Sequence, residues 1–169
     1  MKTAIMNIEK TVITGTYVSI SNEVVASVTI ADEQIAGGKY ENMVFENVLF
    51  ENCTIQASVF LETNFIDCKF LNCNFSFTKF KSCNLVECTF ENCKFSITNS
   101  LKSNYQTCTF LDTNWNNGAF RDNKLMDCSL DTKTSHHIKI TNDDERNTTL
   151  SSNEAFTLSG AAVQLQMAA

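Results

Sequence analysis

The chain repeats itself every five residues, and this period restricts the folds that it can adopt. From Tyr40 to Leu130, every fifth residue is large and apolar or aromatic at 18 of 19 positions, with Ser100 as the exception. Eleven of the 13 phenylalanines occupy this series. Side chains on one face recur with a period of 3.6 in helices and 2 in strands, so five fits neither. The period indicates a short extended step and a corner, repeated as a solenoid.

A second series lies two residues before each large residue and holds mostly small side chains. All 8 cysteines fall in it, which favours a role as small buried hydrophobic residues over metal or redox roles. Met43, Val48 and Asn123 are its larger members. Each pentad thus sends one large and one small side chain inward. The three other positions, mostly polar, are expected to form the outer surface.

Residues 38–131 resemble the pentapeptide-repeat family, whose motif is a small residue, a polar residue, Leu or Phe, and two variable residues. Segments such as Cys53-Thr54-Ile55 and Cys73-Asn74-Phe75 carry it, with Cys or Thr where the family prefers Ala. The resemblance implies an all-β fold, a right-handed quadrilateral parallel β-helix with four pentads per coil. The 19 pentads would make just under five coils, with Phe70 and Phe90 stacked.

The flanking segments depart from the motif. Residues 1–37 are rich in β-branched side chains and are expected to form a strand-rich N-terminal cap or a degenerate coil. Residues 132–169 form a polar tail, in which 132–153 are expected to be loop or disorder and 154–169 a possible C-terminal capping segment. Caps are expected because terminal coils expose unpaired strand edges.

The sequence offers little that would support catalysis. It contains no phosphate loop, HExxH motif or ordered Ser, His and Asp set, and its two histidines, His136 and His137, lie in the polar tail. The cysteine spacing is not that of a zinc site. We therefore expect a protein that is not an enzyme, with no metal, no cofactor and no catalytic residue.

Location and partners are constrained by composition. A signal peptide and a run of 18 apolar residues are both missing from the sequence, and 8 cysteines then suggest a reducing, cytoplasmic setting without a membrane. The net charge of −6 disfavours direct binding to nucleic acid. These features favour a protein partner that binds the outer surface.

One outer surface is expected to be acidic. Positions 20 residues apart place Asp67, Glu87 and Asp127 in one column, with Glu51 and Glu91 on the neighbouring side. The repeats carry 11 acidic and 8 basic residues, so the net charge is modest. This side is either a solvated surface, the usual role of charge, or a partner-binding face.

A second surface is expected to be apolar. Phe77 and Ile97 share an outer column, and Leu61 and Leu101 are expected close to it. Such a patch usually marks a partner surface. The alternative is that a terminal segment of the chain covers it.

Some members of the pentapeptide-repeat family are acidic rods that mimic duplex DNA, bind type II topoisomerases such as gyrase, and protect them from drugs or toxins. The resemblance implies that this chain is such a bacterial DNA mimic, linked to antibiotic resistance. Two alternatives stay open. One is a bacterial effector or scaffold that binds a protein through the apolar patch, and the other is a structural building block, including a homodimer.

Overall fold

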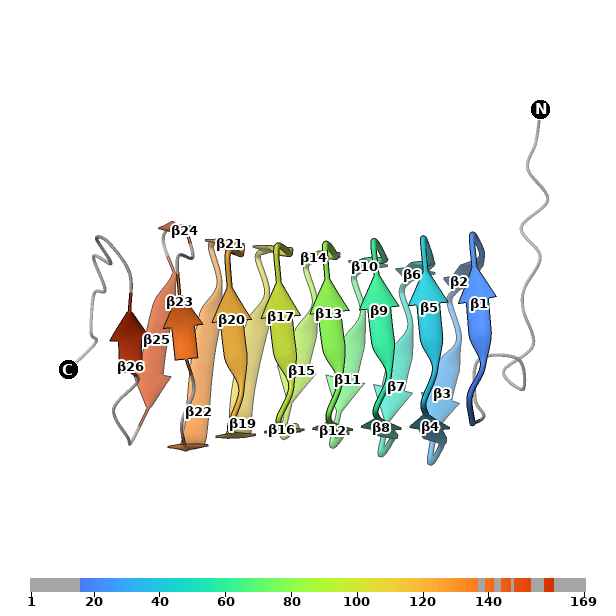
Figure 1. Cartoon of the computed structure of the whole chain (residues 1–169), viewed down its shortest axis with the longest axis horizontal. Helices are drawn as coiled ribbons and strands as arrows, with labels where there is room; N and C mark the ends of the chain where they lie inside the picture. The colour runs from blue at the N-terminus through green and yellow to red at the C-terminus, as the bar shows by residue number, and fades with distance from the viewer. Residues whose placement is uncertain (1–15, 137–138, 142–143, 147, 153–156, 160–169) are drawn as a thin grey trace.

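The computed structural model describes residues 16–136, 139–141, 144–146, 148–152 and 157–159. In these residues the chain is an all-β parallel solenoid of about 6 turns without a helix (Figure 1). Each turn takes 20 residues, since Ser19 pairs with Lys39 and Lys39 with Val59. The prediction of a four-sided β-helix is therefore confirmed. We name its four faces front, upper, back and lower after their places in Figure 1.

The front and upper faces are each one parallel sheet. The front face consists of β1 (Ser19–Ser21), β5 (Lys39–Glu41), β9 (Val59–Leu61), β13 (Lys79–Lys81), β17 (Asn99–Leu101), β20 (Ala119–Arg121), β23 (Lys139–Thr141) and β26 (Thr157–Ser159). The upper face consists of β2 (Val24–Ala26), β6 (Val44–Glu46), β10 (Asn64–Ile66), β14 (Asn84–Val86), β18 (Asn104–Gln106), β21 (Lys124–Met126) and β24 (Asp144–Arg146).

The back and lower faces are joined because two longer strands, β19 (Thr109–Asn116) and β22 (Ser129–His136), run through the corner between them. The back face also contains β3 (Thr29–Ala31), β7 (Leu49–Glu51), β11 (Lys69–Leu71), β15 (Thr89–Glu91) and β25 (Thr149–Ser152). The lower face also contains β4 (Gln34–Ala36), β8 (Thr54–Gln56), β12 (Asn74–Ser76) and β16 (Lys94–Ser96).

The interior is a stack of aromatic rings. The rings of Phe70 and Phe90 have centroids 4.7 Å apart and planes 2° apart, and Phe110 continues the stack at 4.6 Å. Both the large and the small side chains of the pentads are buried. Aromatic side chains each bury about 150–250 Å², which supports a narrow core of this kind.

The solenoid extends beyond residues 38–131 at both ends. Strands β1 to β4 form a complete coil in register with the next one, where the sequence suggested a cap or a degenerate coil. The expectation of loop or disorder after 131 was wrong for the described residues, because β22 to β25 continue the faces there. The polar composition of this segment suggested a loop. Its strands form nonetheless, because the hydrogen bonds between neighbouring strands join backbone groups and do not depend on the side chains. The division into three domains stays a prediction, and most of 154–169 lies outside the described residues.

Candidate interaction surfaces

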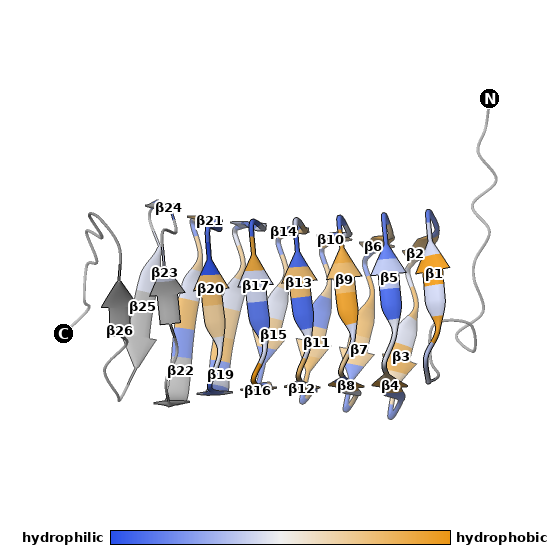
Figure 2. Ribbon diagram, viewed as in Figure 1, coloured by the Kyte–Doolittle hydropathy of each residue, from blue (hydrophilic) through white to orange (hydrophobic). Residues whose placement is uncertain are grey.

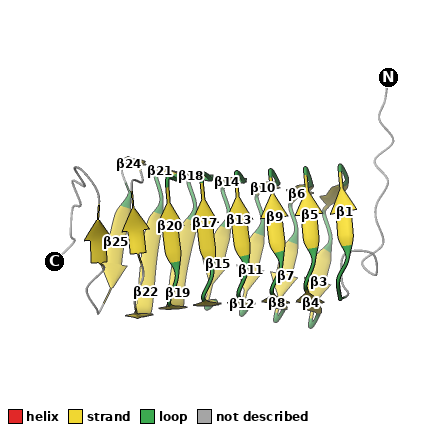
Figure 3. Ribbon diagram, viewed as in Figure 1, coloured by secondary structure: helices red, strands yellow, loops and turns green. Residues whose placement is uncertain are grey.

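The corners of the solenoid are built by the last residue of each pentad, which adopts left-handed backbone geometry. This residue has φ between 49° and 66° at 23 positions from Tyr17 to Asp127, and only Gly37 among them is glycine. Figure 3 shows these corners as the short turns between strands. Asn and Asp, which tolerate this region, occupy 12 of the positions. Their recurrence was a signal for the corner that the sequence analysis did not use.

Amide side chains form ladders along the axis. At the corner between the back and lower faces, Asn52 donates to Asp32, Asn72 to Asn52, and Asn92 to Asn72, at 3.0, 3.1 and 2.8 Å. These residues, 20 apart in the sequence, thus form a continuous hydrogen-bonded ladder. Because these amides bond to one another, the ladder chiefly stabilises the stacking of coils.

Phe77 and Ile97 stand at the corner between the lower and front faces, in one column with Ala57. Their side chains are 54% and 41% exposed, and their φ angles are 53° and 51°. Left-handed geometry is strained for bulky and especially for β-branched residues. An exposed apolar side chain at a strained position gains little for the fold, so this column is a candidate contact surface.

The structure does not group Leu61 and Leu101 with that corner. Both are half-buried at the far, upper end of the front strands, and Lys81 lies between them in the ladder. Val59, the first residue of β9, lies two positions after the corner residue Ala57 and is therefore closer to that corner than Leu61 is. Figure 2 shows this alternation, with hydrophobic β9 next to β13, which is hydrophilic at both ends. The apolar residues predicted as one patch therefore form two groups.

The predicted acidic residues do gather on one side. Asp67, Glu87 and Asp127 occupy the corner between the upper and back faces, while Glu51 and Glu91 lie at the lower edge of the back face. Between residues 32 and 131, this face and its two corners carry one basic residue, Lys69, and the following acidic residues: Asp32, Glu51, Asp67, Glu87, Glu91, Asp112, Asp127 and Asp131.

Two features moderate this acidity. Lys69 forms an ion pair of 2.7 Å with Glu91 on the neighbouring strand. The opposite, front face is more basic, since between residues 39 and 122 it and its corners carry Lys39, Lys79, Lys81, Lys102 and Arg121 against Glu41, Glu62 and Asp122. The rod thus has an acidic back and a basic front.

The cysteines lie inside the solenoid. All 8 are free and buried, and their thiols donate to backbone carbonyl groups, as Cys83 does to Phe60 at 3.3 Å. Burial raises the pKa of Cys83 from 9.0 to about 11. This placement supports the interpretation of Cys as a small core residue.

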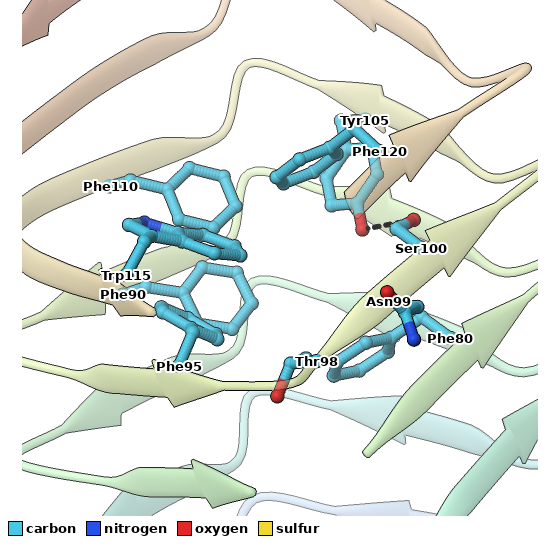
Figure 4. A pocket seen from close by; sticks show the side chains of 10 residues that line it. All are labelled: Phe80, Phe90, Phe95, Thr98, Asn99, Ser100, Tyr105, Phe110, Trp115 and Phe120. Atoms are coloured by element: carbon cyan, nitrogen blue, oxygen red, sulfur yellow. Dashed lines mark hydrogen bonds between the residues drawn. The ribbon is translucent and has the colours of Figure 1, made fainter. Parts of the chain in front are cut away.

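Ser100 marks an irregularity in the core. A cavity of about 10 Å³ lies beside it, lined mostly by aromatic rings (Figure 4). Ser100 donates to Asn123 at 3.0 Å and accepts from the Tyr105 hydroxyl at 2.7 Å. The cavity is about the size of one water probe and mostly apolar, so it is a packing defect rather than a ligand site.

The outer surface of the described residues has open hollows on its faces. Two of them, of about 400 Å³ each, lie on the upper and lower faces, and their charged side chains are those of Lys124 and Lys94, respectively. No three His, Cys, Asp or Glu side chains are grouped as metal ligands in the described ranges. The same residues include no helix long and apolar enough to cross a membrane.

These features define a class of protein, a four-sided β-solenoid built from pentads. The sequence model described as pentapeptide repeats matches residues 58–96 in 8 copies. Residues 58–96 thus match the repeats of the pentapeptide-repeat family. Comparison with curated proteins gave no match.

Solved structures of two pentapeptide-repeat proteins are similar to this chain. One is QnrB1, a plasmid-mediated fluoroquinolone resistance protein, at 11% identity and a TM-score of 0.39, covering 80% of this chain and 83% of QnrB1. The other is HetL from the cyanobacterium Nostoc sp. strain PCC 7120, involved in the regulation of heterocyst differentiation. It has 4% identity and a TM-score of 0.25, covering 80% of this chain and 86% of HetL.

Proposed function

We propose that the chain is a non-catalytic protein-binding rod whose acidic back face occupies the basic DNA-binding surface of a protein, with a type II topoisomerase such as gyrase as the candidate partner. The observation that carries this proposal is the concentration of eight carboxylates against one lysine on the back face and its corners. A straight rod with carboxylates along one side presents charge in the way that duplex DNA presents phosphates.

The charge density limits how closely the rod imitates DNA. Five coils at about 4.8 Å each make a face of about 24 Å, so its carboxylates average about one per 3 Å. Duplex DNA carries one charge per about 1.7 Å. The binding should therefore be weaker per unit length than that of DNA and strongly dependent on salt.

The test is a gyrase supercoiling assay with and without a quinolone. The wild-type chain should inhibit or protect gyrase, and a triple variant with Asp67, Glu87 and Asp127 changed to Lys should not. Lys is acceptable at these corners, because Lys102 has the same geometry, with φ of 51°. The matched control changes Glu41, Glu62 and Asp122 to Lys, on the front face and its upper corner, away from the back face. Equal effects of both triple variants, or no effect of the wild type, would contradict the proposal.

A second candidate is a scaffold or effector that binds a protein through Phe77 and Ile97. It is favoured by their exposure in strained geometry. The double variant Phe77→Asn and Ile97→Asn should then lose a partner that the acidic triple variant retains in a pull-down from bacterial lysate. Loss of the same partner in the acidic variant alone would reject this candidate.

A further inference from the structure

The upper edge of the front face alternates between leucine and a cation along the axis. Leu61 pairs with Lys81, Lys81 with Leu101, and Leu101 with Arg121 in the parallel ladder. Lys81 and Arg121 are exposed, and the leucines are half-buried. Neighbouring strands are about 4.8 Å apart, so each kind of side chain recurs about every 10 Å.

The lower edge of the back face alternates with the same period and the opposite charge. Glu51 pairs with Leu71, Leu71 with Glu91, and Glu91 with Leu111 in the ladder. Asp131 directly follows Leu130 in β22, where the ladder between β19 and β22 becomes irregular. Two edges with equal period, matched leucines and opposite charges are complementary to each other.

We propose that these two faces bind each other between copies of the chain, so that the front face of one copy packs on the back face of a second copy with the axes antiparallel. Reversing the second copy brings its lower back edge against the upper front edge of the first. Once Lys81 is opposite Glu91, the common period also places Arg121 opposite Glu51. The leucines then meet each other: Leu61 opposite Leu111, and Leu101 opposite Leu71.

The lower edge of the front face and the upper edge of the partner's back face are compatible with the same register. Lys79 comes opposite Thr89, and Asn99 comes opposite Lys69, so no like charges meet there. At the end of the register Glu41 comes opposite Asp131, and Lys39, 2.7 Å from Glu41, offsets that repulsion. Alternating apolar contacts and charge pairs fix both the register and the direction of the partner.

The contact is heterologous, because it joins two different faces. Each pair leaves one front and one back face open, so the association continues as a ribbon rather than stopping at a dimer. Each face offers roughly 240 Å² of flat area, from about 24 Å of axis and about 10 Å of strand. This is well below the ~800 Å² per partner of a stable interface, so the association is weak and needs high concentration and low salt.

The experiment is sedimentation velocity over a range of protein concentrations at ~0.01 M and ~1 M salt, where the Debye length is about 30 Å and 3 Å. The average mass should rise with concentration beyond a dimer at low salt and stay monomeric at high salt. Lys81→Glu and Glu91→Lys should each weaken association about tenfold or more. Lys94→Glu, which makes the same charge change on the lower face, should leave it unchanged.

Mixing the two interface variants gives the sharpest result. The reversed front of Lys81→Glu complements the reversed back of Glu91→Lys, so the mixture should associate more strongly than either variant alone. A monomeric wild type at low salt, a closed dimer, equal effects of Lys81→Glu and Lys94→Glu, or a mixture that stays monomeric would each overturn the inference. Circular dichroism checks that every variant is folded.

This inference goes beyond the proposed function and does not require it. Lys81 lies on the front face, so Lys81→Glu should weaken self-association and leave any effect on gyrase intact. Glu91→Lys should weaken both, because it changes the shared back face. The two proposals can therefore fail independently.

Discussion

Tyr105 donates a hydrogen bond of 2.7 Å to Ser100 inside the aromatic core. Ser100 is the residue that interrupts the series of large side chains, and Asn123 is an oversized member of the small series. The Asn123 side chain accepts from Ser100 at 3.0 Å and donates to its carbonyl group at 3.2 Å. Two departures from the repeat pattern and the Tyr105 hydroxyl thus form one buried polar network.

Because the network is connected, we expect its members to be coupled energetically. Ser100→Leu should destabilise the fold by ~1–3 kcal/mol, since it removes a partner of two buried polar groups. The triple variant Ser100→Leu, Tyr105→Phe and Asn123→Cys restores the repeat pattern and should be as stable as the wild type or more so. Thermal unfolding followed by circular dichroism measures both. A triple variant as unstable as the sum of its single changes would contradict the coupling.

The fold could largely be predicted. The five-residue period gives the inward residues, and the resemblance to the pentapeptide-repeat family gives four pentads per coil and so the stacking of positions 20 apart. Phe70 and Phe90 show this, as their stack is the one that four pentads per coil implies. The C-terminal extent of the solenoid could not be predicted. The strand from Thr149 to Ser152 is polar, and its hydrogen bonds come from the backbone, so its side chains do not mark it as a strand. The separation of Leu101 from Phe77 could not be predicted either. Sequence spacing shows which residues stack along the axis, but it does not show how far apart two such columns lie across a face.

The buried thiol of Cys83 predicts a loss of stability at high pH. Burial raises its pKa from 9.0 to about 11, so the folded state keeps a proton that the unfolded chain releases. This stabilisation is complete below about pH 9 and is lost as the pH rises towards 11, and it amounts to ~3 kcal/mol. Urea unfolding of wild type and Cys83→Ser at about pH 8 and about pH 11 isolates it.

Serine is a suitable replacement, because Ser103 occupies the next position in the same inner column. The variant should lose less stability than the wild type over this range. If both lose the same amount, the thiol does not contribute, and other groups that titrate there account for the effect.

The corner geometry predicts that Ile97→Asn stabilises the fold. Ile97 has φ of 51°, where a β-branched side chain is strained and Asn is tolerated. Relief of ~1 kcal/mol should raise Tm by about 2–4 °C. Ile66→Asn is the matched control, since Ile66 is similarly exposed at 39% but lies in a strand. An equal rise for the control would show that loss of exposed apolar surface, rather than backbone strain, is responsible.

The ion pair between Lys69 and Glu91 predicts a variant that improves the acidic face. Its two side chains are 46% and 36% exposed, so the pair contributes ~0–1 kcal/mol to stability. Lys69→Gln removes the basic charge of the back face and frees Glu91, so it should bind a basic partner surface more tightly, with a steeper dependence on salt. Lys94→Gln on the lower face is the control. Gyrase inhibition titrated at low and moderate salt checks the change, and weaker inhibition by Lys69→Gln would show that the back face is not the surface that binds.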